Sequence, residues 1–428
     1  MVVSGATGFR TTWWWRFMLT QIRRNRTALA LARWIWQYGD RLCYIARVYL
    51  TAPPRYPLQP LSTIIPIESR IILAPGGSVV TPAPAVFPAG RARHLVSPHA
   101  RYEYPPIYLG TLANALVTGG TNLIRYGEGV VCHDQYDPRR DDTAEELHHR
   151  TFVHPSRGEI SWLIPAASPA RLPRAGAFTD ACSANYAHWL TEVLPKIHLF
   201  CREDSNAGTP IVVDAGLHPN LIESLRLVAG DSRRIITLAP DETVLVEELL
   251  VISAAGYVPF GRRSCAGGGH AHGLFSSQGL TVLCDQLNGA LAAGAGSDGV
   301  KLYLRRSTET RNAINRAEIE ALLVEQGFTV IEPERLSFSE QVRMFASADI
   351  VVGVTGAAFA NLIFCRPATR IVILVSNYRQ LSYWYWQNIA CATGHRITYV
   401  IGACTEWPSH PHSSYAVDIQ DVLDAINE

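Results

Sequence analysis

The clearest pattern of apolar and polar positions lies in the last third of the chain, where short apolar runs alternate with helical patterns. We expect strands at 301–305, 328–331, 350–354 and 371–375, and helices at 316–326, 339–348 and 357–364. β-Branched runs such as DIVVGV and RIVILV are typical of parallel strands that are covered on both faces. Ser337 and Glu340 have the spacing of a capping box at the start of the second helix. The pattern predicts a doubly wound α/β domain.

The first half has a weaker pattern. Strands are expected at 70–73, 210–213 and 244–252, and helices at 185–200 and 220–229. Residues 51–106 are rich in proline and lack a helical period, and residues 289–299 are small and flexible. We therefore divide the chain into a helical segment (1–50), an α/β lobe with a proline-rich lead-in (51–288), a linker (289–299), a second α/β lobe (300–405) and a C-terminal tail or helix (406–428).

Composition adds few constraints. The 428 residues are 48% hydrophobic and carry a formal net charge of +1, so the chain is neither a mostly disordered protein nor an evident nucleic-acid binder. Its nine cysteines show no CxxC spacing. Reduced thiols in a cytoplasmic protein are the simplest interpretation.

Residues 10–50 depart from this balance, because they carry eight arginines and one aspartate among many aromatic residues. Arginines interrupt every apolar run, so the segment is neither a membrane span nor a secretory signal. Its composition suits a helix on an anionic membrane surface. The alternative is a helix that packs on its own domain or on a partner subunit.

The turn from Gly353 to Asn361 follows a predicted strand at the edge of the sheet where ligands bind in such domains. Thr355, Gly356, Ala357 and Ala358 are small, so a ligand can approach the backbone, and the next helix would direct its N–H groups at that ligand. This indicates a phosphate or pyrophosphate site. The alternative is a tight turn that needs small residues only for packing.

Arginines at the end of the first strand of this domain support the anion site. Arg305 and Arg306 are adjacent, so only one of them faces the ligand crevice, and Arg311 follows in the next loop. A guanidinium at this edge is well placed to bind phosphate oxygens. A surface ion pair is the simpler alternative.

A second candidate site lies in the first half, in the sequence from Asn185 to Pro195. In a helix, His188 and Glu192 share one face, and Asn185 lies one turn earlier. A carboxylate at this spacing fixes the tautomer of the imidazole and raises its basicity, which suits a general base. We expect either Glu192 or Asn185 to orient His188 for this role. The alternative is a core histidine with no catalytic role.

Other polar clusters carry less information. His270 and His272 lack a third metal ligand nearby, so no metal site is expected. His133, Asp134 and Asp137 are interpreted first as a solvated loop and second as contributors to an acceptor site. The GxGxxG match at 294–299 precedes a strand, so it is a linker and not a dinucleotide fingerprint.

The order of these motifs carries a resemblance. N-x-x-H-W-x-x-E-x-L-P at 185–195 is followed by YLRRS at 303–307, N-x-x-E at 315–318 and the tract GFTVIEPERLSFSEQVRMFASADIVVGVTGAAFANLIF at 327–364. This resembles glycosyltransferase family 61, which includes bacterial capsular and exopolysaccharide enzymes. The similarity covers roughly residues 180–425.

The resemblance implies a GT-B architecture of two Rossmann-like lobes with a cleft between them. It implies that a nucleotide-diphosphate sugar binds the C-terminal lobe and that the sugar is transferred with inversion, without an essential metal or other cofactor. By position, Arg306 matches the nucleotide-phosphate arginine of the family, 355–361 matches its H-G-A-G-L-x-N loop, and His188 matches a histidine to which we assign the role of base.

Two positions depart from that loop, because Thr355 replaces its histidine and Ala358 its second glycine. We expect the Thr355 hydroxyl to donate a hydrogen bond to phosphate, although it carries no charge, and Ala358 to narrow the approach to the backbone. We expect an inverting glycosyltransferase that acts on a hydroxyl of a glycan or lipid-linked acceptor in surface polysaccharide synthesis. Such an enzyme would be cytoplasmic and peripheral on the inner membrane. The alternative is a non-catalytic nucleotide- or glycan-binding homologue, or a scaffold of a polysaccharide assembly complex.

Overall fold

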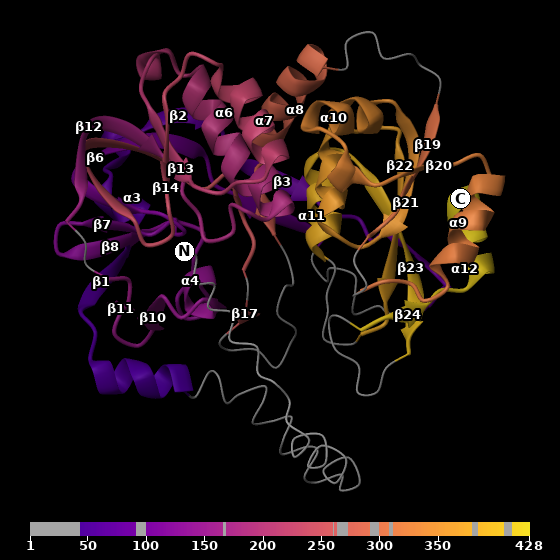
Figure 1. The fold of residues 1–428 in the computed structure, drawn as a ribbon, viewed down its shortest axis with the longest axis horizontal. Coiled ribbons are helices and arrows are strands. Elements are labelled where there is room, and N and C mark those ends of the chain that lie inside the picture. Colours follow the sequence, from indigo (N-terminus) through magenta and orange to yellow (C-terminus); the bar gives the residue numbers. More distant parts are fainter. Residues whose placement is uncertain are drawn as a thin grey trace, which may run out of the picture.

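The computed structural model describes residues 43–90, 100–165, 168–259, 261–262, 273–291, 299–307, 311–378, 384–405 and 413–428. Two α/β units lie side by side, each built on its own large sheet (Figure 1). We call the unit of the first sheet the N-lobe and that of the second sheet the C-lobe. The expected mixed α/β fold is confirmed.

The C-lobe sheet has five consecutive parallel strands in the order β20-β19-β21-β22-β23. Their bounds are β19 Val300–Leu304, β20 Thr329–Ile331, β21 Ala348–Val354, β22 Arg370–Ser376 and β23 Arg396–Cys404. The chain runs outward from β19 to β20 and then returns across β19 to β21. The crevice at the carboxyl ends of β19 and β21 is therefore the topological switch point at which ligands bind in doubly wound sheets.

Helices cover both faces of this sheet. One face carries α9 (Arg316–Glu325) and α12 (Ile419–Asn427), and the other carries α10 (Phe338–Ala346), the 3₁₀ helix η6 (Ala357–Phe364) and α11 (Trp384–Ala392). A short 3₁₀ helix, η5 (Pro333–Arg335), follows β20. The capping box of Ser337 and Glu340 at the start of α10 is confirmed.

The C-lobe also takes strands from both ends of the chain. β24 (Tyr415–Ala416) pairs antiparallel with β23, so the C-terminal tail belongs to this lobe. β4 (Ala85–Phe87) pairs parallel with β23, although it comes from the proline-rich lead-in. The lead-in therefore contributes to both lobes and not to the N-lobe alone.

The N-lobe sheet is mixed. Four strands are parallel, in the order β15-β12-β13-β14, and a mostly antiparallel region, in which only β1 and β8 among the described strands pair in parallel, continues the sheet beyond β15. The parallel strands are β12 (Ala170–Ala177), β13 (Ile211–Asp214), β14 (Ile235–Leu238) and β15 (Thr243–Ile252). The continuation contains β1 (Arg55–Pro60), β2 (Ile71–Ala74), β6 (Ile107–Thr118), β7 (Ile124–Tyr126), β8 (Gly129–Cys132), β10 (Thr151–His154) and β11 (Glu159–Trp162). Only the part formed by the four parallel strands β15, β12, β13 and β14 resembles a Rossmann-like sheet.

Further elements, most of them short, lie outside the two large sheets and the helices described so far. The strands are β3 (Gly77–Val80), β5 (Arg101–Tyr104), β9 (Asp141–Asp142), β16 (Gly256–Tyr257), β17 (Gly261–Arg262) and β18 (Leu274–Phe275). The helices are α3 (Leu61–Ile64), η1 (Ile67–Ser69), α4 (Ala144–Leu147), η4 (Asp204–Asn206), α7 (Pro219–Ala229) and α8 (Ser277–Leu291).

The helix expected at 185–200 contains a turn of π-helix. α5 (Tyr186–His188) continues into η3 (Trp189–Val193), which is π-helical, and then into α6 (Leu194–Arg202). Pro195 explains the widened turn, since it has no N–H for the carbonyl of Thr191 and its ring would clash with that carbonyl in an α-helix. The Thr191 oxygen lies 2.5 Å from the position that a Cβ on Gly256 would occupy. This turn therefore needs a glycine beside it.

The lobes are joined by packing and by hydrogen bonds. One apolar core runs through both of them. Glu223 of α7 accepts hydrogen bonds from the N–H groups of Phe338 (2.7 Å) and Ser339 (3.0 Å) at the start of α10. The Tyr186 hydroxyl donates to Asn361 Oδ1 at 2.7 Å. These contacts fix the wall of the site described below.

Residues 43–51 form a helix at the outer edge of the N-lobe, drawn in indigo in Figure 1. Tyr44 is buried, stacks on His149 at 4.3 Å and donates to the carbonyl of Thr151, whereas Tyr49 and Leu50 are 62% and 86% exposed. One face of this helix thus packs on its own domain, and the rest of the segment 1–50 lies outside the described residues. Within the described ranges, no helix combines the length and apolar character needed to cross a bilayer.

Candidate active site

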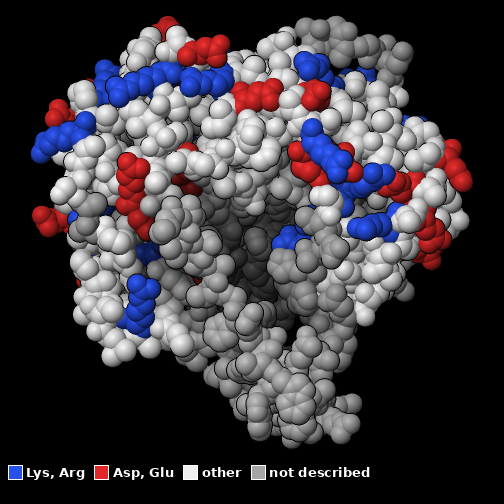
Figure 2. Space-filling view, in the orientation of Figure 1, with Lys and Arg blue, Asp and Glu red and all other residues white. Residues whose placement is uncertain are grey.

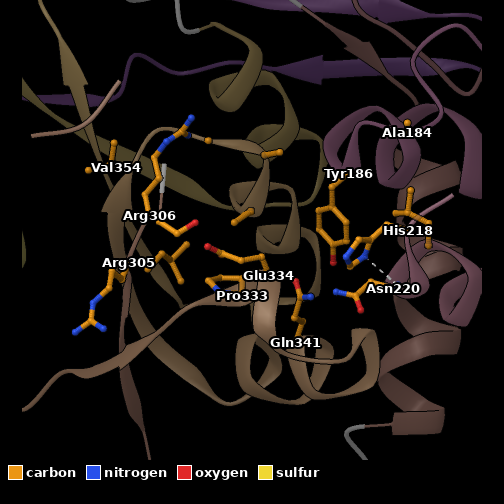
Figure 3. A pocket seen from close by; sticks show the side chains of 16 residues that line it. Ala184, Tyr186, His218, Asn220, Arg305, Arg306, Pro333, Glu334, Gln341 and Val354 are labelled. Carbon is orange, nitrogen blue, oxygen red and sulfur yellow. Dashed lines mark hydrogen bonds between the residues drawn. The ribbon is translucent and has the colours of Figure 1, made fainter. Parts of the chain in front are cut away.

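A cavity of about 410 Å³ lies between the lobes, at the switch point of the C-lobe sheet (Figure 3). We call it the interlobe cavity. The C-lobe contributes residues that follow β19, β20 and β21, and the N-lobe contributes Tyr186 and the start of α7. Figure 2 shows that the molecule is also hollowed between the lobes. The cavity therefore combines a ligand edge of the sheet with residues from the other lobe.

Arg306 enters this cavity directly after β19. Its Nη1 donates to the carbonyl of Thr355 at 3.0 Å, and a Cβ on Gly356 would lie 2.4 Å from the same nitrogen. Glycine at 356 is thus what allows the guanidinium to lie against the loop. Arg305 points the opposite way (Figure 3) and pairs with Glu320 and, at 3.1 Å, with Glu332.

The charge around Arg306 favours an anion. Burial lowers the pKa of Arg306, and the nearby cation of Arg311 lowers it further. Arg311 has a left-handed backbone conformation, with φ of 56°, but it is not among the residues that line the cavity. Two guanidinium groups that destabilise each other are stabilised when a phosphate binds beside them.

The loop after β21 divides into residues that face the cavity and residues that do not. Gly356, Ala357 and Ala358 line it. The Thr355 side chain is 6% exposed, and its hydroxyl accepts a hydrogen bond from Trp386 Nε1 at 2.9 Å. Asn361 is fully buried between Tyr186 and Gln341, to which it donates at 2.8 Å. The expected ligand contacts of the Thr355 and Asn361 side chains are therefore corrected, because packing turns both of them away from the cavity.

The helix after this loop also differs from the expectation. Residues 357–364 form a 3₁₀ helix and not an α-helix. A 3₁₀ turn still leaves its first N–H groups without intrahelical partners. The loop backbone at 356–358 thus keeps the donors that the sequence suggested for a phosphate.

Glu334 and His218 are among the cavity residues that the sequence analysis missed. Glu334 is exposed in η5, which follows β20, and its carboxylate raises the pKa of Arg306, against the effects of burial and of Arg311. His218 caps α7, and its Nδ1 accepts the N–H of Asn220 at 3.2 Å, so the ring hydrogen belongs on Nε2. The rule that ligands bind at strand ends, applied to the strand predicted at 328–331, is the signal for Glu334. No sequence signal placed His218 here.

His188 and Glu192 form the expected pair. His188 Nδ1 lies 2.5 Å from Glu192 Oε1, and Glu192 Oε2 accepts the N–H of Val258 at 3.3 Å. When His188 is neutral, the carboxylate keeps the ring hydrogen on Nδ1, so Nε2 carries the lone pair. Burial lowers the pKa of His188, but the charges and hydrogen bond of Glu192, together with Asp180, raise it by more, so this pKa lies above its usual value. This is the tautomer of a general base.

Asn185 does not assist the imidazole. Its Oδ1 accepts the N–H of Ala187 at 3.0 Å and caps the helix. The expectation that Asn185 orients His188 is therefore corrected, since an N-cap side chain is directed at the helix end and not along its side.

His188 lines a second, smaller space within the N-lobe, which we call the N-lobe cavity. It consists of two adjoining hollows of about 40 and 60 Å³ that share Asn122, Cys132, His133, Asp180 and Glu192. Asp180, which the sequence analysis missed, follows β12 and accepts a hydrogen bond from Asn122 Nδ2 at 2.8 Å. Burial, with the nearby Lys196, lowers the pKa of His133 to about 4, so His133 is neutral near pH 7.

The two cavities lie on different sides of one helix. Tyr186 faces the interlobe cavity, whereas His188, two residues later, faces the N-lobe cavity. Two residues correspond to about 200° around a helix, which explains the separation. The resemblance led us to expect His188 and Arg306 in one open cleft. This expectation is corrected, because in the described part of the chain one helical turn separates the cavity that His188 lines from the cavity that Arg306 lines.

No metal site emerges from the described part of the chain. There, no group of three or more His, Cys, Asp or Glu side chains is arranged to hold a metal ion. His270 and His272 lie outside the described residues.

Comparison with known proteins identifies one family. Residues 186–372 match the family model described as Glycosyltransferase 61. The match begins at Tyr186 and continues through the carboxyl ends of β19, β20 and β21, so it contains both His188 and Arg306. No curated protein matches the chain.

Proposed function

We propose that this chain, whose residues 186–372 belong to glycosyltransferase family 61, transfers a sugar from a nucleotide-diphosphate donor to a hydroxyl of a glycan or lipid-linked acceptor. In this proposal the two lobes work as a GT-B enzyme, the transfer inverts the anomeric centre and no metal is required. The position of Arg306 at the switch point is the observation that carries it.

The donor diphosphate is assigned to the C-lobe side of the interlobe cavity. The Arg306 guanidinium and the backbone N–H groups at 356–358 are the donors of hydrogen bonds there. Cationic and N–H donors stabilise the charge that grows on a departing diphosphate. The leaving group needs no proton, since a nucleoside diphosphate departs as an anion.

The nucleoside is assigned to the part of the same cavity between Glu334 and His218. Glu334 would repel a diphosphate placed against it, but its carboxylate is a good acceptor for ribose hydroxyls. It follows the second strand of a doubly wound sheet, where such folds place ribose-binding carboxylates. His218 Nε2–H is then a donor for the nucleoside from the N-lobe.

His188 is assigned as the base. Its Nε2 removes the proton of the acceptor hydroxyl, the oxygen forms a bond to the anomeric carbon from the face opposite the nucleotide, and the bond from that carbon to the diphosphate breaks. Glu192 stabilises the imidazolium that forms. Since one helical turn separates the two cavities, this assignment requires them to join when both substrates bind.

The donor assignment is tested with two adjacent arginines. Arg306→Gln removes the cation from the cavity, whereas Arg305→Gln removes one that points outward and is already paired. Titration calorimetry with uridine and guanosine diphosphate should show at least tenfold weaker binding for Arg306→Gln and binding within twofold for Arg305→Gln. Equal losses in both variants would contradict the assignment.

A nucleotide- or glycan-binding homologue without turnover is the second candidate. It is favoured by the separation of His188 from Arg306. Release of nucleotide from a panel of nucleotide sugars, with and without acceptor glycans, decides between the two. The enzyme should turn over, and His188→Gln should abolish transfer while leaving nucleotide binding within twofold. Nucleotide binding by the native chain with no transfer to any acceptor would favour the second candidate.

The cellular setting is part of the proposal. An acceptor carried on a lipid, and the cationic residues 10–50, would place the reaction on the cytosolic face of the inner membrane during surface polysaccharide synthesis. Co-sedimentation of the native chain with anionic vesicles tests the first step of this idea.

A further inference from the structure

A groove of about 440 Å³ lies at the outer edge of the N-lobe, beside the helix of residues 43–51. Its lining includes Arg47 and Thr51 from that helix, Tyr56 of β1, Arg125 of β7 and Trp162 of β11. Thr243, at the start of β15, lines this groove, and Ile252, at the end of the same strand, lines the N-lobe cavity. The two spaces come closest at β7, where Arg125 lines the groove and Ile124 lines the N-lobe cavity. Adjacent residues of a strand point to opposite faces of a sheet, so the sheet separates the groove from the candidate active site.

Arg125 is the central feature of the groove. Its guanidinium lies 3.6 Å from the ring centre of Tyr56 and 5.9 Å from that of Trp162. Its Nε is buried and has no hydrogen-bond acceptor, and no described carboxylate pairs with it. A half-buried cation without an acceptor is costly, and an anion in the groove would remove that cost.

The other lining residues define the ligand. None of them is acidic, so Arg47 and Arg125 give the groove an uncompensated positive charge. Four prolines, Leu116, Leu163 and Ile164 make much of the remaining wall apolar. We propose that this groove binds the phosphate headgroup of an anionic membrane lipid, with the apolar wall in contact with the glycerol and the first methylenes of the lipid.

Two further observations favour a membrane lipid over a segment of this chain. Leu50, the neighbour of Thr51 on the helix that carries Arg47, is 86% exposed and adds an apolar side chain next to the groove. Residues 1–42, which lead into this helix, contain seven arginines and one acidic residue, Asp40. They are repelled by the groove and attracted to the same anionic surface.

The test measures binding of the full chain to vesicles of phosphatidylglycerol, with phosphatidylcholine vesicles as the neutral comparison. An arginine near an anionic membrane contributes about 1 kcal/mol, or about fivefold in affinity. Arg125→Gln should weaken binding to phosphatidylglycerol about fivefold, and Arg47→Gln with Arg125→Gln about 25-fold. Arg343→Gln, at an exposed arginine of α10 in the C-lobe, is the matched control and should bind like the native chain.

A second variant leaves both arginines in place. Thr51→Glu puts a carboxylate on the exposed rim, one helical turn from Arg47, and should weaken binding about as much as Arg125→Gln. Thr63→Glu, at an exposed threonine of α3 outside the groove, should not. The pair keeps the test valid if Arg125→Gln unfolds.

Three results would overturn the proposal. In the first, the native chain fails to bind phosphatidylglycerol vesicles. In the second, Thr51→Glu and Arg125→Gln both bind these vesicles like the native chain, which would assign binding to residues 1–42. In the third, glycerol phosphate gives the same Arg125-dependent thermal shift as dihexanoyl phosphatidylglycerol, which would make the ligand a free phosphate. Nucleotide binding is measured in parallel and should stay unchanged in every groove variant.

Discussion

Gly356→Ala tests the donor site, because the added methyl group would clash with Arg306 Nη1 and with no other atom. A Cβ at 356 would lie 2.4 Å from Arg306 Nη1, and the next nearest atoms are at 3.7 and 3.8 Å. The φ of Gly356 is 177°, which alanine adopts without strain. The clash therefore falls on the flexible end of one side chain, and we expect the fold to tolerate it.

The cost appears in nucleotide binding. Arg306 must leave the Thr355 carbonyl, and its guanidinium moves from the position assigned to the diphosphate. Loss of one hydrogen bond to a charged group costs about 1.5–3 kcal/mol. Binding of uridine or guanosine diphosphate should thus weaken roughly 10- to 150-fold in calorimetry, whereas the melting temperature should change little.

Gly289→Ala provides the control. Gly289 lies in α8, and a Cβ there has no atom within 4 Å. This variant should bind nucleotide like the native chain and should be slightly more stable, since alanine favours the helix. Nucleotide affinity of Gly356→Ala within twofold of native, with Arg306→Gln strongly impaired, would refute the reasoning that the glycine positions the guanidinium.

Other predictions concern the base, the lobe contact and the loop. Glu192→Gln lowers the pKa of His188, because the carboxylate is what raises it; the fall of transfer activity on the acid side should therefore move to lower pH, as measured in a pH–rate profile. The charged pair of His188 and Glu192 contributes stability below about pH 6.5, and this stability is lost as pH rises through the raised pKa of His188. The difference in melting temperature between the native chain and Glu192→Gln should therefore be larger at pH 6 than at pH 9. An equal difference at the two pH values would contradict the pairing. Tyr186→Phe leaves the buried Asn361 Oδ1 without its donor and should lower the free energy of unfolding in urea by about 1–3 kcal/mol. Tyr49→Phe, at a tyrosine that is 62% exposed, is the comparison and should change it little. Thr355→Val removes the acceptor of Trp386 Nε1 and should lower the free energy of unfolding by about 1–3 kcal/mol, while nucleotide affinity stays within twofold of native. Thr355→Ser should keep the native stability and the native affinity. A large loss of nucleotide affinity in Thr355→Val alone would show that the hydroxyl binds the ligand.

The C-lobe was predictable because its strands are buried runs of β-branched residues between amphipathic helices. The alternation of side chains along β19 also predicted that Arg305 and Arg306 point to opposite sides. The N-lobe gave weaker signals for local reasons. Pro173 interrupts β12, and Asn114 has a left-handed backbone within β6, so neither strand shows a clean period of two.

The remaining errors at the site come from long-range packing. The spacing of His188 and Glu192 fixed their contact, but it does not state which side of the helix meets the C-lobe. That side is set by Tyr186 and Asn361, which are 175 residues apart in sequence. Thr355 likewise looked like a ligand residue until α11 brought Trp386 against it.

The short strand β4 has a consequence for how the molecule can move. Because residues 85–87 pair with β23, the backbone passes from one lobe to the other and back again before it crosses finally after α8. Three covalent crossings restrain relative sliding of the halves and favour rotation about a line through the crossings. A fragment that begins at residue 299 would also leave an edge of β23 open to intermolecular pairing, so the two halves should be produced as one polypeptide.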